Sequence, residues 1–124
     1  MKVITVSASV AEAAAQIRQT LNTKGFTIFA DIDHQANAES VELELAAART
    51  LIFGNPAAGT KLMQKDITMS LDLPMRIAIV DNNGETQVLH QTTNDYTRVY
   101  QVEGHPVLEK VEGLFATLAS ELTE

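Results

Sequence analysis

The fold of this chain is marked most clearly by one central stretch, Phe53-Gly54-Asn55-Pro56-Ala57-Ala58-Gly59-Thr60. The apolar run Thr50 to Phe53 leads into it and is typical of a strand. Proline fixes its own φ and disfavours helical geometry in the preceding residue, so the chain must turn at Asn55. A short helix over Thr60 to Lys65 is predicted next. The stretch therefore indicates a passage from strand to helix.

A strand and a helix are predicted near the start of the chain. Val3 to Val6 is a short apolar run, and Ser9 stands three residues before Glu12, which is the spacing of a capping box at a helix start. Apolar residues then recur at helical spacing as far as Gly25, which can end the helix in a left-handed conformation. Phe26 to Asp33 has the composition of a second strand.

A hairpin and a last helix are predicted in the second half. Asn83-Gly84 readily takes two positive φ angles, and the strand-like runs Arg76 to Val80 and Thr86 to Gln91 flank it. From Pro106 onward, apolar residues follow helical spacing without a break, so this helix places one apolar stripe on the sheet.

Two regions are not decided by their patterns. Within residues 35–48, the apolar positions fit both one face of a helix and the alternation of a strand. Residues 92–105 permit a strand, but their polar neighbours favour a loop.

Together these elements predict a single domain over residues 1–124, of the α+β class. The order is β-α-β4-α, in two layers, with the helices on one face of an antiparallel sheet. A chain of 124 residues with 45% hydrophobic residues is large enough for one core.

The composition argues against several classes of function. The absence of cysteine excludes disulfides, thiolate nucleophiles and cysteine-ligated zinc. Sixteen acidic against nine basic residues give a net charge of -7, which disfavours nucleic acids and anionic membranes as partners. No run approaches the ~20 apolar residues of a membrane span. We therefore expect a cytoplasmic protein without a nucleic-acid or membrane partner.

Four blocks in order resemble the domain of unknown function 302 family of small bacterial and archaeal proteins. They are Ile32 to Ala36, Leu51 to Pro56, Gly59 to Met63 and Leu71 to Arg76. The resemblance implies a fold similar to the TATA-box-binding-protein repeat (TBP-like) and a homodimer. It implies no catalytic residue, because none is established for the family, and Asn94 to Gly104 matches no block.

A polar group lies at the end of the second predicted strand. Alternation places Asp31 and Asp33 on one sheet face and His34 on the other. Asp33 and His34 are candidates for an acid–base pair in an enzyme of unknown reaction, since histidine titrates near neutral pH. The competing interpretation is that they hydrogen-bond a turn. Neither a metal nor a cofactor is predicted, because His90 and His105 are too distant in sequence to complete a ligand set.

The central turn is the second candidate site. Free amides at a helix start, together with Lys61, would hold a phosphate or a carboxylate. The P-loop spacing is not met, because Thr60 stands where that motif needs lysine. The competing interpretation is that the glycines only shape the crossing from strand to helix. The candidate ligand-pocket residues are Asp33, His34, Gly54, Asn55, Pro56, Lys61 and Asp72.

The leading hypothesis is therefore a homodimeric binding or interaction module with a small-molecule pocket near Gly54-Asn55-Pro56. The alternative is the enzyme that uses Asp33 and His34. Arg76 stands within an apolar predicted strand, so it must face solvent, a partner subunit or a carboxylate such as Asp72.

Overall fold

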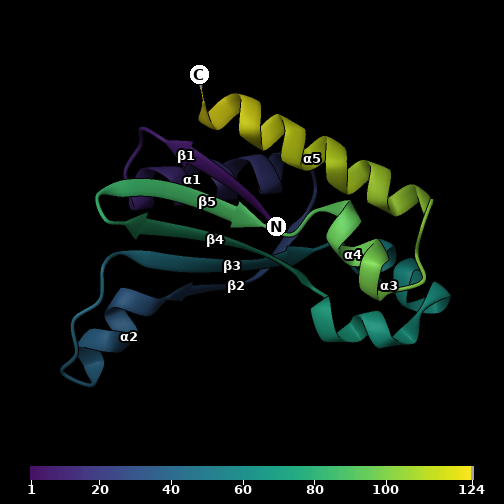
Figure 1. Ribbon diagram of the computed structural model, residues 1–124, viewed down its shortest axis with the longest axis horizontal. Coiled ribbons are helices and arrows are strands. Elements are labelled where there is room, and N and C mark those ends of the chain that lie inside the picture. Colours follow the sequence, from purple (N-terminus) through teal and green to yellow (C-terminus); the bar gives the residue numbers. More distant parts are fainter. Residues whose placement is uncertain (124) are drawn as a thin grey trace.

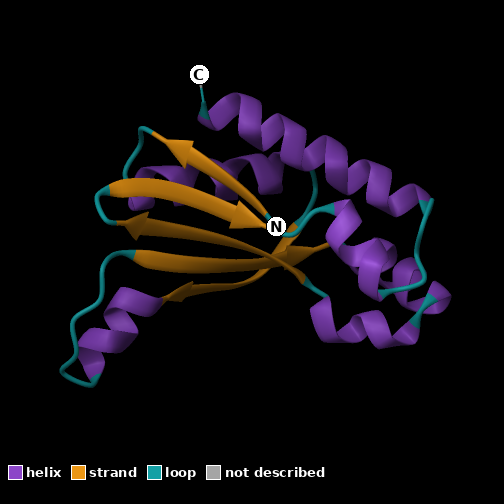
Figure 2. Cartoon of the chain, in the orientation of Figure 1, coloured by secondary structure: helices purple, strands orange, loops and turns teal. Residues whose placement is uncertain are grey.

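Five strands form one antiparallel sheet in the computed structural model, which describes residues 1–123 (Figures 1 and 2). Across the sheet the order is β1-β5-β4-β3-β2, and every neighbouring pair is antiparallel. The strands are β1 (Lys2–Val6), β2 (Thr27–Asp33), β3 (Ala48–Gly54), β4 (Met75–Asn82) and β5 (Glu85–His90). The predicted α+β class and the antiparallel sheet are confirmed.

Two long helices cover one face of the sheet. They are α1 (Val10–Thr23) and α5 (Pro106–Leu122), and they also contact each other. Their apolar stripes bury against the side chains that point to this face, such as Leu51, Ile77 and Ile79, each fully buried. The predicted order β-α-β4-α and the two-layer arrangement are therefore correct.

Several helix ends and one turn lie where the sequence predicts them. The Ser9 hydroxyl accepts a hydrogen bond from the Glu12 amide at 3.1 Å at the start of α1. Gly25 follows that helix with a φ of 82°. Asn83 and Gly84, with φ values of 55° and 92°, join β4 to β5. Positive φ at both central positions matches the twist of an antiparallel hairpin.

Three shorter helices and one 3-10 segment join the strands. They are α2 (His34–Ser40), α3 (Pro56–Lys65), η1 (Ile67–Asp72) and α4 (Thr93–Val99). The undecided region 35–48 therefore begins as a helix and continues as a loop into β3.

The interpretation of residues 92–105 as a strand or a loop is wrong for Thr93–Val99, where α4 lies, whereas residues 100–105 do form a loop. The Thr92 hydroxyl accepts from the Asp95 amide, and the Asp95 carboxylate accepts from the Thr92 amide, which completes a capping box. These bonds satisfy the orphan donors at the helix start. Buried Tyr96 then fixes α4 against the rest of the molecule.

The second face of the sheet has no helix layer over it among residues 1–123. Side chains that pair across this face include Ile52, Ala78, Val80 and Leu89, and each of them stays partly exposed. The neighbouring Val3 is 43% exposed. In residues 1–123, no helix combines the length and the apolar character needed to cross a bilayer.

Candidate functional site

A cavity of about 290 Å³ lies where β2, β3 and β4 meet α3 and α5. None of its lining residues is charged, and only Asn55 and Thr60 bring polar side chains. The others are glycine or apolar: Phe26, Phe29, Phe53, Gly54, Pro56, Ala58, Gly59, Leu62, Met63, Leu73, Pro74, Met75, Val107 and Val111. This composition suits a small ligand with a mainly apolar surface.

A bulge in β2 shapes the mouth of the cavity. The strand register shifts between Ile28 and Ala30, which leaves Phe29 as the extra residue. Phe29 is half exposed, yet it still lines the cavity. A Cβ built on Gly54 would lie 3.7 Å from the Phe29 ring and 3.7 Å from Pro74, an ordinary contact distance. Gly54 therefore stands beside the Phe29 ring at the mouth.

The start of α3 does not offer the free amides that the anion hypothesis needs. The Asn55 side-chain oxygen accepts hydrogen bonds from the amides of Ala57 and Ala58, at 2.9 and 3.2 Å. The Gly59 amide donates to the Asn55 carbonyl at 2.8 Å, and Pro56 has no amide hydrogen. Asn55 acts as the N-cap of α3 and occupies the place where an anion would bind.

Lys61 and Asp72 lie outside the lining of the cavity. Lys61 is exposed. The Asp72 carboxylate accepts a hydrogen bond from the Arg76 guanidinium at 3.3 Å and another from the Tyr100 hydroxyl. Arg76 therefore faces solvent and the Asp72 carboxylate. These are two of the three environments predicted for a charged residue within an apolar strand.

Asp33 and His34 lie at the other end of the sheet. Thr27 pairs with Gly54, whereas Asp33 pairs with Arg49. At the usual rise per residue, the two ends of the β2–β3 pair are about 20 Å apart. Figure 1 shows α2 and α3 at opposite ends of the sheet.

Polar side chains at this second end have partners within the chain. The Asp33 carboxylate caps α2 by accepting from the Ala36 amide at 2.9 Å. The His34 ring is 2.7 Å from the Thr50 hydroxyl. Asp33 and His34 thus take part in two separate contacts, and their pairing as acid and base stays a prediction.

The Asp31 carboxylate, near Asp33 and His34, forms ion pairs with two arginines. It accepts from Arg18 of α1 at 2.8 Å and from the Arg49 Nε at 3.1 Å, with a further contact from the Arg49 terminal nitrogen. Hydrogen bonding to Asp31 is the main cause that raises the pKa of Arg49 above its usual value. The three charges tie α1 to β2 and β3.

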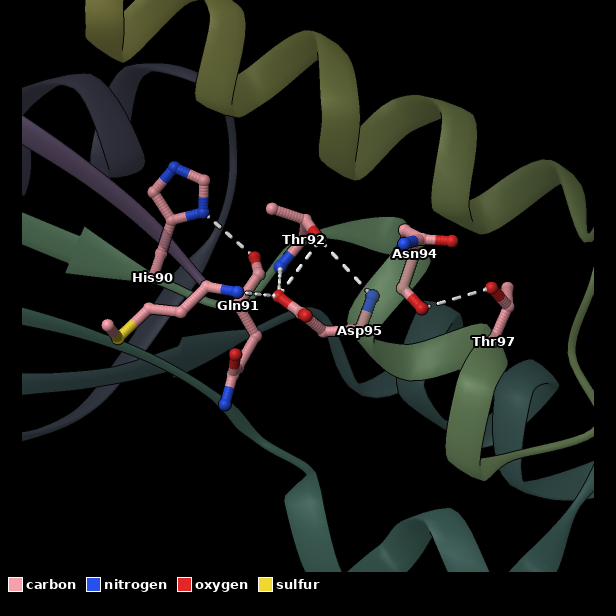
Figure 3. A network of polar contacts seen from close by, with 7 residues as sticks. His90, Gln91, Thr92, Asn94, Asp95 and Thr97 are labelled. Carbon is pink, nitrogen blue, oxygen red and sulfur yellow. Dashed lines mark hydrogen bonds and ion pairs between the residues drawn. The ribbon is translucent and has the colours of Figure 1, made fainter.

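A third polar group joins the end of β5 to α4 (Figure 3). His90 Nδ1 donates to the Gln91 carbonyl at 2.8 Å, and the His90 ring stacks on Phe115 with ring centres 3.7 Å apart. The Asp95 carboxylate accepts from Thr92 and contacts the amino group of Met1, which lowers the pKa of Asp95. Figure 3 draws no hydrogen bond or ion pair between His90 and Asp95. Among residues 1–123, no three potential ligands converge on a metal site.

Of the predicted pocket residues, Gly54, Asn55 and Pro56 line the cavity, whereas Asp33, His34, Lys61 and Asp72 do not. The apolar wall could not be predicted from motifs, because its residues have no acid–base or anion-binding chemistry. One signal was available: Phe29 is a large aromatic residue that falls on the wrong side of the alternation in its strand.

The family model described as Domain of unknown function DUF302 matches residues 2–123. The chain belongs to this family. A crystal structure of the uncharacterized conserved protein DUF302 from Bacillus stearothermophilus aligns with 98% of this chain and 96% of that chain. The TM-score is 0.79 at 15% sequence identity, which shows that the DUF302 fold is shared. The likeness to the TATA-box-binding-protein repeat stays a prediction.

Three curated relatives from Brucella match part of this DUF302 chain. They are the Fluoride-specific ion channel FluC 1 of Brucella suis biovar 1 and of Brucella abortus biovar 1, and FluC 2 of Brucella melitensis biotype 1. Each is 39% identical over 88 residues, which is 70% of this chain. The chain spans about a third of the length of these relatives, 34% in the first and 32% in the other two.

Proposed function

We propose that this protein is a cytoplasmic, homodimeric binding module whose cavity beside Gly54-Asn55-Pro56 takes a small, mainly apolar ligand. The cavity itself is the observation that supports the proposal. Its volume of about 290 Å³ lies near the lower limit of ordinary ligand pockets, which begin at about 300 Å³. Its wall combines three phenylalanines with aliphatic side chains, whereas the polar motifs of the chain lie elsewhere.

Binding of a neutral fluorescent dye, N-phenylnaphthylamine, tests this function. We expect saturable binding of one dye per chain. Ala58 lines the cavity, and its neighbour Ala57 is exposed and does not. Ala58→Leu should therefore weaken dye binding, and Ala57→Leu, the same change one residue earlier in α3, should not.

Thermal melts of both variants show whether they fold. Absence of saturable binding to the wild-type protein would contradict the proposed function. Equal loss in the two variants would place the dye outside the cavity.

The open face of the sheet supports the homodimer. It presents Ile52, Val80 and Leu89 without a helix layer among the described residues, with half-exposed Val3 at one edge. The same face carries Arg76 and Gln87 between these apolar residues. A second copy of the chain would cover such a mixed face symmetrically.

Light scattering after size exclusion measures the assembly. We expect twice the chain mass of 13.5 kDa for the wild-type protein. Val80→Lys places a charge on the open face and should give the single-chain mass. Ala15→Lys, on the exposed side of α1, should leave the dimer intact. A wild-type protein that elutes at the single-chain mass would contradict this part of the proposal.

A second candidate function is a module that acts together with a fluoride channel, which the similarity to the three Brucella relatives favours. Fluoride itself does not suit the cavity, because a small anion pays a large desolvation cost where no charged group faces it. Deletion of the gene in its host should increase sensitivity to added fluoride. Unchanged growth over a fluoride series would contradict this candidate.

A further inference from the structure

We propose that the ligand of the cavity is uncharged and contains a flat ring system of about two fused rings, which packs against the α3 backbone at Gly59. Resting on the cavity-binding function proposed above, this names the chemical class of the ligand. It also assigns to Gly59 a role in selecting that ligand.

The size of the ring system follows from the volume. A buried cavity of about 150 Å³ holds one benzene ring. The volume of about 290 Å³ is close to twice that value, so it suits two fused rings, and a substituent on them would extend into the open mouth beside Phe29.

The walls favour an aromatic ligand over a saturated one. Phe26 and Phe53 meet edge to face, with ring centres 5.7 Å apart and planes at 77°. Phe29 stands at the mouth with half of its surface exposed. Aromatic rings prefer such edge-to-face and offset arrangements, and a ligand ring would extend the set. Met63 and Met75 also line the cavity, and their sulfur atoms pack well beside rings.

The lack of charge on the ligand follows from the polar groups at the mouth. No lining residue is charged, and the Thr60 hydroxyl already donates to the Pro56 carbonyl at 2.7 Å. The Asn55 oxygen is used by the two amides of α3. These groups leave the Asn55 amide nitrogen to meet one polar substituent, whereas a carboxylate or an ammonium group would lose its hydration without compensation.

Gly59 is the residue at which we expect the ligand to contact the α3 backbone closely. It lies inside the helix, where glycine is a poor helix former compared with alanine. Its φ is not positive, and a Cβ at this position would have no atom within 4 Å outside its own helix turn and chain neighbours. The fold therefore gives no steric reason for glycine here. Since Gly59 borders the cavity, its bare backbone is open to a ligand ring that packs against α3.

Gly113 offers a matched control. It lies inside α5, and a Cβ there would also have no atom within 4 Å. Unlike Gly59, it does not line the cavity. Gly→Ala at either position should raise the melting temperature or leave it unchanged, because alanine is the better helix former.

Three compounds of similar shape test the ligand class by titration calorimetry. They are naphthol, the fully saturated decahydronaphthol and the charged naphthoate. We expect naphthol to bind more tightly than decahydronaphthol by between about twofold and tenfold, which corresponds to the usual gain from aromatic pairs. Naphthoate should bind more weakly than naphthol by about tenfold or more.

The variants test the assignment of Gly59. Gly59→Ala should weaken naphthol binding by about fivefold or more, because the new methyl group overfills the site. Gly113→Ala should leave naphthol affinity unchanged. Equal naphthol affinity in wild type and Gly59→Ala would overturn the role of Gly59.

The outcomes separate this inference from the function on which it rests. If decahydronaphthol or naphthoate binds as well as naphthol, the ligand class is wrong but the cavity still binds small molecules. If none of the three compounds binds and the neutral dye does not bind either, the proposed function fails as well.

Discussion

The two ends of the β2–β3 pair differ in what surrounds their side chains. At the α2 end, Asp31, Asp33 and His34 have hydrogen-bond partners within the chain. At the α3 end, an apolar wall surrounds a cavity of about 290 Å³ that no side chain fills. Polar residues that resemble catalytic residues in the sequence can have a structural role in linking helices and strands. A ligand site, in contrast, can be built from apolar residues that belong to no sequence motif.

The largest effect is expected at the α3 end, from Phe53→Ala. Phe53 is fully buried, and its ring meets Phe26 and Phe115 at 5.7 and 6.2 Å between centres. Removing it should lower the free energy of unfolding by about 3–5 kcal/mol. Chemical denaturation measures this loss. Phe29→Ala is the comparison, because Phe29 is half exposed and should cost far less stability while it weakens dye binding. Equal losses of stability would contradict the distinction between wall and mouth.

A smaller effect is expected at the α2 end from Asp31→Asn. The change keeps the shape but removes the charge that Arg18 and Arg49 share. Arg18 is 41% exposed, so solvent screens part of the interaction. We expect a loss of about 1–2 kcal/mol in the free energy of unfolding, since hydrogen bonds to charged groups contribute more to stability than hydrogen bonds between neutral groups. Dye binding in the cavity should not change, and a change would show that the two ends are coupled.

The contrast between the ends also explains what could be predicted from sequence. Periodicity and turn signals act locally, so α1, α5 and the Asn83-Gly84 hairpin were predicted correctly. The helix α4 was not predicted, because the residues around its capping box also favour strands. The anion hypothesis did not foresee that Asn55 would cap its own helix. The cavity itself depends on how Phe29, Met63 and Val111 meet in space, and no local pattern contains that information.

Capping gives a further test at the α2 end. Asp33→Ala removes the N-cap of α2 and should cost about 1 kcal/mol of stability. His34→Ala removes one contact with Thr50 on a partly exposed surface and should cost about 0.5 kcal/mol or less. Urea denaturation of the two variants gives the order. A loss from His34→Ala that exceeds the loss from Asp33→Ala would mean that His34 has a structural role beyond its contact with Thr50.

The smallest expected effect concerns pH and His90, which lies on the helix-covered face between the two ends. Burial lowers the pKa of His90 below its usual value. The Lys2 and Met1 amino groups act in the same direction, and the hydrogen bond to the Gln91 carbonyl and the charge of Asp95 oppose them. The unfolded chain therefore takes up a proton more readily than the folded one. Stability from this group is fully present above the usual pKa of about 6.5 and is lost as the pH falls through it toward the lower folded pKa.

Melting temperatures measured from about pH 7.5 down to about pH 5.5 test this linkage, because most carboxylates stay ionised over that range. The wild-type protein should lose about two degrees or less as the pH falls. His90→Phe keeps an aromatic ring to stack on Phe115 but cannot take up a proton, so its melting temperature should change less. If both proteins show the same slope, the pH dependence arises elsewhere, and the buried ring of His90 serves packing alone.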